Sequence, residues 1–367
     1  MTTTQRVRRA GLATVAALVI GGSGVAIGAA AADSSASGTL AAATSTQSPA
    51  AGPATSTGVT GPGPASYASV VRQVLPSVVL IRTGNGLGSG VVLDTKGNIV
   101  TNAHVAGDAT RFQVQVAGDT APRSARLVGT YPPDDLAVIR ADDPSGLQPA
   151  KFGDSGTVQA GDVVLAIGNP LGLSGSVTQG IISATDRAVT EPATDGSPAA
   201  TLPGAIQTSA PINPGNSGGA LVSASGQVVG IPTLAAGSPQ GGGQAQGIGF
   251  AIPSNLARDI ATQIIDTGHV TNSHRAAIGA EVATVLGPDG TAGGVGVVAV
   301  TSGGGAERAG LRAGDVITAV GGAQTTDTTA LSQALAAAKP GDTVTVTVSR
   351  DGQDRSVQVT LGELPGS

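Results

Sequence analysis

The sequence contains no cysteine at all. This absence excludes disulfide bonds, thiolate zinc sites and a cysteine nucleophile. It also excludes a lipoprotein anchor, because that lipid is carried on a cysteine. The chain has only three histidines and no His-Glu-x-x-His motif, so we predict no metal site and no cofactor.

Aromatic and charged residues are also scarce. Aromatic residues make up 1% of the chain, charged residues make up 12%, and the formal net charge is −5. A mildly acidic chain is not expected to bind nucleic acid, since such proteins usually carry a basic patch. The apolar fraction is 40%, so the core must consist of valine, isoleucine, leucine and alanine. The 57 glycines favour many turns and short strands over a helix bundle.

The N-terminal segment has the pattern of a targeting element. Arg6, Arg8 and Arg9 precede 23 uncharged residues, which end in four alanines at 29–32. A cleaved signal peptide and a retained single-pass membrane anchor both fit residues 1–32, and the sequence leaves both open. In either case the charge bias predicts that the rest of the chain is extracytoplasmic.

Residues 33–66 are predicted to be a disordered linker. Thirty of these 34 residues are alanine, glycine, serine, threonine or proline. Such a segment cannot bury enough apolar area to offset the entropy cost of ordering it.

A β-rich region runs from 67 to 268. Predicted strands lie at 77–83, 88–93, 98–101, 111–116, 136–140, 163–167, 180–183, 219–222 and 227–231. One helix closes the region, with Ser254 as its expected N-cap, Gly268 as its stop, and an apolar stripe at Leu256, Ile260 and Ile264. Many short strands and no long helix predict an all-β barrel or sandwich.

A second unit is predicted from 276 to 364. Strands are expected at 295–300, 343–350 and 356–361, with a helix at 328–339 and a hairpin turn at Asp351-Gly352. About 90 residues of mixed α and β structure suffice for one small core.

Three short segments of the β-rich region carry residue types suited to acyl transfer. TNAHV contains His104, DDLAV contains Asp134 and Asp135, and GNSGG contains Ser217. A serine hydroxyl needs a base to remove its proton, and that base is usually a histidine oriented by a carboxylate. The glycines beside Ser217 allow backbone N–H groups to converge on a developing oxyanion.

These segments, together with GSGVVLD, AIGNPLGL, INPGNSGGAL and GIGFAIPS, occur in a familiar order and spacing. Residues 70–362 thereby resemble the HtrA/Deg family of trypsin-like serine proteases. The resemblance implies a mainly β fold, in which a trypsin-like double six-stranded β-barrel is followed by a small α+β PDZ domain. It assigns His104 as general base, Asp135 as the residue that orients it, and Ser217 as nucleophile. Asp135 is preferred over Asp134 because the family pattern places the aspartate directly before Leu-Ala. The oxyanion hole would use the N–H groups of Gly215 and Ser217, with Asn216 in the same loop.

Two departures from digestive relatives bear on activation and specificity. Asn216 stands where those enzymes have an aspartate that pairs with a newly cut N-terminus, so that mode of activation is not expected. Pro211 stands where trypsin has the acidic residue that holds lysine or arginine, and Ile212 follows it. We therefore expect a small, apolar primary pocket. The strand along which substrates of the family lie is represented by Thr233, Leu234 and Ala235.

Two other motif interpretations are rejected. GNSGG also matches the nucleophile elbow of α/β-hydrolases, but that fold needs strand–Ser–helix, and the residues after Ser217 predict strand–turn–strand. The glycine-rich run at 84–90 lacks the spacing and the following helix of a phosphate loop, so it is interpreted as a close-packed strand.

The second unit resembles a bacterial PDZ domain, mainly through AERAGLRAGDVI at 306–317. PDZ domains bind extended C-terminal peptides by strand addition. The resemblance assigns the carboxylate loop to Ile278, Gly279 and Ala280, and a wall of the groove to Leu331. Leu335 fits either the groove or the core.

Two function classes remain. The first is an exported endopeptidase that cleaves unfolded or damaged proteins in quality control and stress response, regulated by its PDZ domain. The alternative is a non-catalytic chaperone or binding protein with a PDZ domain. Unfolded polypeptides and C-terminal peptides are the expected partners in the first class. Trimers are the habit of the family, but the five aromatic residues offer few anchors for a homotrimer interface.

Overall fold

The computed structural model describes residues 64–84, 86–169, 175–191, 200–213, 215–237, 244–287 and 290–365. The predicted targeting segment at 1–32 and the predicted linker up to residue 63 lie outside these residues. Among the helices of the described ranges, none is both long and apolar enough to cross a membrane.

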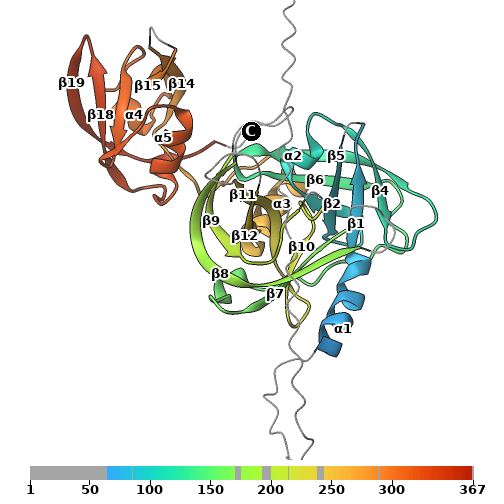
Figure 1. Cartoon of the computed structure of the whole chain (residues 1–367). Helices are drawn as coiled ribbons and strands as arrows, with labels where there is room; N and C mark the ends of the chain where they lie inside the picture. The colour runs from blue at the N-terminus through green and yellow to red at the C-terminus, as the bar shows by residue number, and fades with distance from the viewer. Residues whose placement is uncertain are drawn as a thin grey trace, which may run out of the picture. The chain divides into compact units, whose positions relative to one another are not determined.

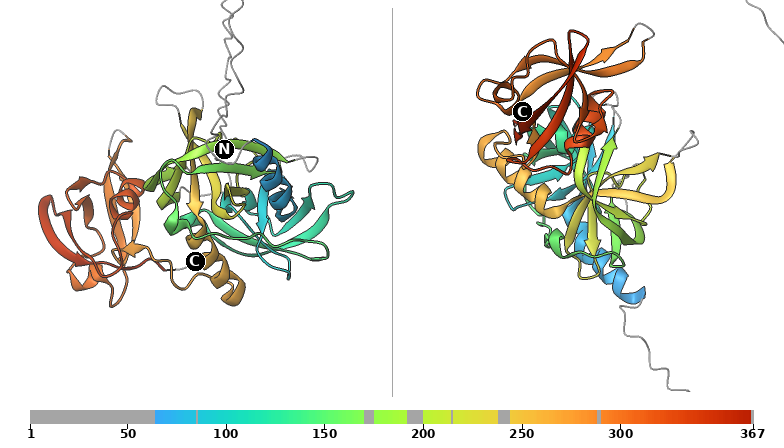
Figure 2. Two further views of the ribbon diagram at one scale, coloured as in Figure 1. Left: turned by 90° about the horizontal axis from the view of Figure 1, so that it is seen from below. Right: turned by 90° about the vertical axis from the view of Figure 1, so that its left-hand side faces the viewer.

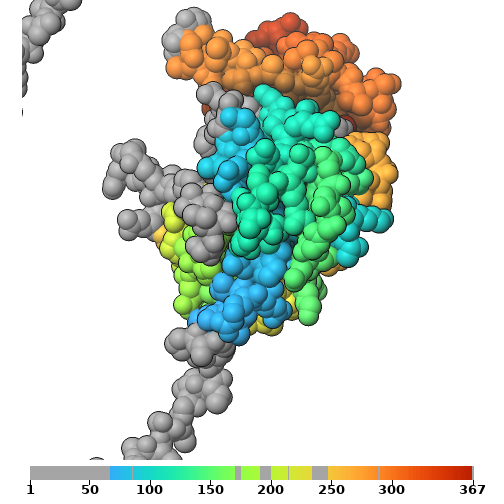
Figure 3. Space-filling model, turned by 90° about the vertical axis from the view of Figure 1, so that its right-hand side faces the viewer, coloured from blue at the N-terminus to red at the C-terminus, as the bar shows by residue number. Residues whose placement is uncertain are grey.

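A helix that the sequence did not predict opens the described chain. α1 (Pro64–Val74) runs into the short 3-10 helix η1 (Leu75–Ser77). The last three residues of the predicted linker therefore belong to α1. Val70 and Val74 are buried in a core cluster that also contains Val222 and Val228. The helix thus packs as part of the barrel unit, and Figure 3 shows the blue segment that contains it lying directly on the barrel surface.

The first six strands close into a barrel in the order β1-β2-β3-β6-β5-β4. Their bounds are β1 (Val78–Arg82), β2 (Leu87–Val92), β3 (Asn98–Thr101), β4 (Arg111–Val116), β5 (Arg123–Tyr131) and β6 (Leu136–Ala141). The interior contains β-branched side chains, Val79, Ile81 and Ile99 among them, which favour the pleated conformation. The glycine-rich run contributes to β2, as predicted. A Cβ on Gly88 would meet Val105 at 2.5 Å, so the close packing there requires glycine.

A second closed barrel follows in the order β10-β11-β12-β9-β8-β7. Its strands are β7 (Val163–Gly168), β8 (Ser176–Glu191), β9 (Ala200–Thr208), β10 (Ala220–Ser223), β11 (Val228–Gly237) and β12 (Gln244–Pro253). The two barrels are drawn in Figure 1. The sequence prediction missed β5, β9 and β12, and it found only a short part of β8. Gly129, Pro203, Gly204 and Gly247 lower the local strand propensity of the missed segments.

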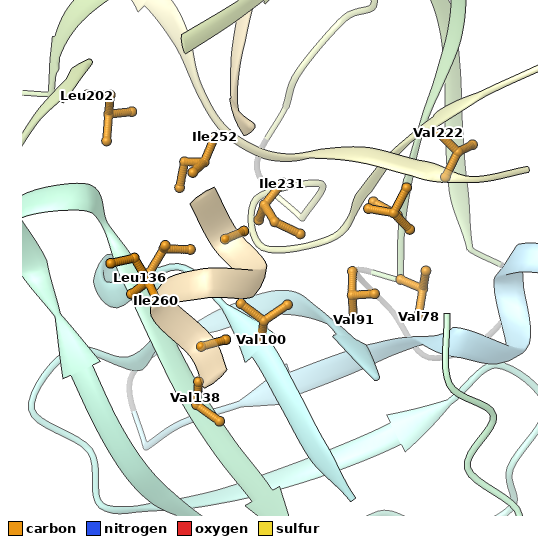
Figure 4. Packing of buried hydrophobic residues seen from close by; sticks show 14 of the residues in the cluster. Val78, Val91, Val100, Leu136, Val138, Leu202, Val222, Ile231, Ile252 and Ile260 are labelled. Atoms are coloured by element: carbon orange, nitrogen blue, oxygen red, sulfur yellow. The ribbon is translucent and has the colours of Figure 1, made fainter. Parts of the chain in front are cut away.

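The two barrels share a buried junction. One cluster combines Val100 and Val138 of the first barrel with Ile231 and Ile252 of the second, and Ile260 of α3 (Ser254–Thr267) joins it. Figure 4 shows these side chains gathered between the ribbons. The active-site candidates come from both barrels, so this apolar junction determines their separation.

α3 confirms the predicted stripe, because Ile260 and Ile264 are fully buried. The helix contacts β5 and β6 of the first barrel and β11 and β12 of the second (Figure 2). It ends at Gly268, which has the left-handed φ of 82° that glycine adopts without strain. The prediction that Ser254 is the N-cap was wrong. Pro253 holds that position, and the Ser254 hydroxyl instead donates to the carbonyl of Gly153 at 2.9 Å.

The C-terminal unit is a sheet with strand order β14-β15-β16-β18-β19, in which β17 pairs with β16. Its elements are β13 (Ala276–Ala277), β14 (Ala280–Leu286), β15 (Ala292–Val300), α4 (Gly305–Arg308), β16 (Val316–Val320), β17 (Ala323–Gln324), α5 (Thr328–Leu335), β18 (Thr343–Arg350), β19 (Gln353–Thr360) and β20 (Gly362–Glu363). Asp351 and Gly352 have φ values of 54° and 74°, which confirms the predicted tight hairpin turn. The predicted mainly β fold class is therefore confirmed.

Candidate active site

His104 and Asp135 form the first part of the candidate site. His104 lies in α2 (Ala103–Ala106), which begins two residues after the end of β3, and Asp135 lies between the 3-10 helix η2 (Pro132–Asp134) and β6. One carboxylate oxygen of Asp135 lies 2.9 Å from His104 Nδ1, and the other accepts the backbone N–H of His104 at 2.9 Å. Asp135 is 1% exposed. These two contacts restrict both the position and the orientation of the imidazole ring.

The backbone around Asp135 is built to hold this contact. Asp135 has a φ of 52°, in the left-handed region that aspartate tolerates better than most residues. Its N–H donates to Pro132 O at 3.0 Å, and its carbonyl accepts the N–H of Ala103 and the side-chain amide of Asn102, both at 3.1 Å. The turn that carries the aspartate is therefore bonded directly to the helix that carries the histidine.

Thr233 of β11 connects the two barrels at this point. Its hydroxyl donates to Oδ2 of Asp135 at 2.6 Å, and its carbonyl accepts the Ser217 hydroxyl at 2.9 Å. The resemblance places Thr233 only on the substrate strand, and this double contact is evident only in the structure. No local pattern indicates it, because Thr233 and Asp135 are 98 residues apart in the chain.

Ser217 lies in a turn that depends on glycine. Gly215 has a φ of 106°. The N–H of Asn216 donates to the carbonyl of Asn213 at 3.0 Å and closes the turn that contains Gly215. Gly218 has a φ of 78°, and a Cβ there would lie 2.2 Å from the carbonyl oxygen of Ser89. Residues with a side chain are strained at such φ values, so this turn requires glycine at positions 215 and 218.

The side chain of Asn216 is hydrogen-bonded within its own loop. Its side-chain amide donates to Pro211 O at 3.3 Å, and the residue is 1% exposed. A neutral hydrogen bond within the loop thus occupies the place of the ion pair that digestive relatives make.

The positions expected to form the primary pocket are occupied by the uncharged residues Pro211 and Ile212. Ile212 is 4% exposed and packs against Gly249, where a Cβ would lie 2.4 Å from its Cγ1. Leu234 and Ala235 belong to β11 and pair with Phe250 and Gly249 of β12. Their side chains lie outside the described residues.

Asp134 has a different partner from Asp135. It is fully buried and accepts from the guanidinium of Arg275 at 3.0 Å. Burial raises the pKa of Asp134 from 3.8 to about 6, although Arg275 acts in the opposite direction. Burial likewise raises the pKa of the nearby Tyr131 to about 12. The two adjacent carboxylates therefore differ sharply in their surroundings.

The other two histidines are not near a metal-binding set. His274 Nε2 lies 3.1 Å from Asp259, and His269 Nδ1 lies 3.0 Å from the carbonyl of Thr267. Among the residues that the structure describes, no group of three or more histidine and acidic side chains could hold a metal ion.

The C-terminal unit contains a groove between β14 and α5. Gly279 has a φ of 79° directly before β14, which is the edge strand of the sheet. Ile278, Leu331 and Leu335 are 3%, 5% and 8% exposed and belong to the core, yet they also line a cavity of about 170 Å³. The core and groove interpretations of Leu335 are therefore compatible.

Two family models match the chain. One describes a trypsin-like peptidase domain and matches residues 88–231, and the other describes a PDZ domain and matches residues 270–361.

Curated relatives match over most of the chain. Serine protease PepD of Mycobacterium tuberculosis is 39% identical over 81% of this chain and 66% of its own length. Periplasmic serine endoprotease DegP of Escherichia coli is 39% identical over 75% of this chain and 56% of its own length. Serine endoprotease DegS of Salmonella typhimurium is 37% identical over 82% of this chain and 87% of its own length. The chain thus spans between 56% and 87% of the length of these relatives.

Solved structures agree in fold. The serine endoprotease from Yersinia pestis is 37% identical, with a TM-score of 0.52 over 81% of this chain and 98% of that one. The HtrA-type protease AlgW, solved with a decapeptide, is 34% identical, with a TM-score of 0.53 over 82% of this chain and 99% of that one. On these matches, the chain belongs to the HtrA/Deg family of trypsin-like serine proteases with one PDZ domain.

Proposed function

We propose that the protein is an exported serine endopeptidase whose catalytic triad is Ser217, His104 and Asp135. The observation that carries the proposal is the chain of contacts around one buried carboxylate. Asp135 holds His104 by its ring and its backbone, and Thr233 joins the same carboxylate to the nucleophilic serine.

The proposed reaction is acyl transfer in two halves. Ser217 Oγ attacks the scissile carbonyl carbon while His104 Nε2 removes the hydroxyl proton, and Asp135 stabilises the resulting imidazolium through Nδ1–H. The N–H groups of Gly215 and Ser217 bind the oxyanion. His104 then protonates the leaving amine, and a water activated by the same ring hydrolyses the acyl-enzyme.

The proposed substrates are unfolded or damaged polypeptides with small aliphatic residues at the cleavage site. The uncharged residues Pro211 and Ile212, at the predicted primary pocket, offer no partner to a lysine or arginine side chain.

The PDZ unit is proposed to bind free apolar C-termini. Its carboxylate loop would consist of Ile278, Gly279 and Ala280, and its regulatory effect would be exerted on the protease unit.

An extracytoplasmic location is proposed from the charged and apolar N-terminal segment, and it agrees with relatives described as periplasmic.

The test uses the full chain with casein as substrate and a fluorophosphonate label. The wild type should cleave casein and take up one label per chain, and Ser217→Ala should lose both while keeping its circular dichroism spectrum. Ser223→Ala, which removes a partly exposed hydroxyl on β10, is the matched control and should retain both. Proteolysis retained by purified Ser217→Ala would refute the assignment.

A further inference from the structure

Ser89 is a fully buried polar residue on β2 of the first barrel, and its contacts reach the nucleophile loop of the second. Its hydroxyl donates to the carbonyl of Gly215 at 2.6 Å and accepts the N–H of Asn169 at 2.8 Å. Its backbone N–H donates to the carbonyl of Ser217 at 2.9 Å, and its own carbonyl accepts the hydroxyl of Thr101 at 2.7 Å. All polar groups of Ser89 thus have a partner.

The two carbonyls that Ser89 binds belong to the residues that would supply the oxyanion donors. A residue's carbonyl and N–H are joined through its φ and ψ, so a bond to the carbonyl also restricts the direction of the N–H. Gly215 has the greatest need of such a restraint, because at a φ of 106° it has no side chain to limit its conformation.

The remaining surroundings of the loop restrict it by close packing. A Cβ on Gly168 would lie 2.4 Å from the carbonyl oxygen of Gly215, so backbone packs tightly against that peptide. On Gly218 a Cβ would meet the carbonyl oxygen of Ser89 at 2.2 Å and the hydroxyl oxygen of Thr101 at 2.4 Å. Packing excludes some positions of the loop, but only directional hydrogen bonds select the angle of each peptide plane.

We propose that Ser89 is a positioning residue for the oxyanion hole: it acts through Gly215 and Ser217, across the junction of the two barrels, without touching the substrate. The inference rests on the proposed triad function. Preorganised donors are effective only when they are aimed at the position that the oxyanion will occupy, so a small change in φ or ψ at Gly215 or Ser217 that turns its N–H away lowers the rate.

The decisive variant is Ser89→Ala, which removes only one oxygen atom. The cavity that it leaves is small enough that we expect the protein to remain folded. It leaves the carbonyl of Gly215 and the N–H of Asn169 each without the Ser89 partner in a buried site. We expect kcat to fall by about tenfold, within the range of about 5- to 150-fold that corresponds to the cost of an unmade buried hydrogen bond, while KM stays within about twofold. Ser89→Thr keeps the hydroxyl and should recover part of the lost kcat.

Ser254 provides the matched control. It is also fully buried, and its hydroxyl also donates to a glycine carbonyl, that of Gly153 at 2.9 Å, but outside the nucleophile loop. Ser254→Ala should lose comparable thermal stability and keep its kcat. A merely structural role of Ser89 would make the two alanine variants alike in kcat.

A second readout isolates the oxyanion itself. A peptide aldehyde forms a hemiacetal with the nucleophile and places its oxygen in the hole, whereas the corresponding peptide alcohol does not. Ser89→Ala should weaken binding of the aldehyde by the same factor by which kcat/KM falls, and it should leave binding of the alcohol unchanged.

Three results would overturn the inference, and they are distinguishable. If Ser89→Ala matches Ser254→Ala in kcat, or raises KM alone, Ser89 has no positioning role and the triad assignment still holds. If binding of the aldehyde and binding of the alcohol weaken equally, the defect lies in substrate binding. If the wild type neither cleaves casein nor takes up the fluorophosphonate label, the proposed function itself fails.

Discussion

Replacement of Asp135 by asparagine tests the orienting role of this carboxylate with almost no change of shape. All three side-chain contacts of Asp135 are with donors: the backbone N–H of His104 at 2.9 Å, its Nδ1 at 2.9 Å, and the Thr233 hydroxyl at 2.6 Å. An asparagine has one acceptor oxygen and one amide group that can only donate. Either orientation of the amide therefore breaks part of this set.

The two orientations have different consequences. If the amide nitrogen faces the backbone N–H of His104, two donors oppose each other in a buried site. If it faces the imidazole, it donates to Nδ1 and forces the proton onto Nε2, where the ring cannot accept a proton from Ser217. The second arrangement is the known defect of the general trypsin-like template, in which it lowers kcat by about 10⁴. We expect a loss of that order here, equivalent to about 5.5 kcal/mol.

The assay is kcat/KM on a fluorogenic peptide at neutral pH, with Asp134→Asn as the adjacent control. Asp134 contacts Arg275 rather than His104, so its replacement should cost less than about tenfold in rate. If Asp134→Asn were the crippling change and Asp135→Asn nearly silent, the assignment of the orienting carboxylate would be wrong.

Three further predictions concern stability, specificity and the PDZ unit. Because the pKa of Asp134 rises from 3.8 to about 6 on folding, its contribution to the free energy of unfolding is complete below pH 4 and is lost as the pH rises through 6. The free energy of unfolding, measured with urea at pH 4 and at pH 7, should therefore increase for Asp134→Asn relative to the wild type by up to about 3 kcal/mol between the two pH values. The same difference between variant and wild type at both pH values would contradict this. Cleavage sites mapped in a denatured protein should follow small aliphatic residues, as the uncharged site at Ile212 implies; a dominant preference for lysine or arginine would refute it. Peptides ending in valine or alanine should bind the full-length Ser217→Ala protein through the loop at Ile278-Gly279, and their C-terminal amides should bind much more weakly; equal binding would remove the carboxylate-loop assignment.

Much of the fold follows from local patterns in the sequence. β3, β4 and β18 have the predicted bounds, and the stripe of α3 is buried as expected. These elements combine β-branched alternation or 3.6-residue periodicity with clear turn residues, so neighbouring positions alone specify them. The motifs that contain His104, Asp135 and Ser217 were equally clear, because this chemistry requires particular residue types in glycine-rich or strand-end positions.

What the sequence alone did not determine depends on partners far away in the chain. β5, β9 and β12 contain glycine or proline, and they are strands because barrel closure pairs them with neighbours. Ser89 is 126 residues from Gly215, and a buried hydroxyl in a strand leaves no periodic pattern that names its acceptor. Local periodicity reports which face of an element is buried, whereas the partner of a side-chain hydrogen bond is decided only when the two barrels pack together. The sequence therefore predicts the residue types of the proposed triad, and the contacts between these residues and their neighbours arise from the tertiary structure.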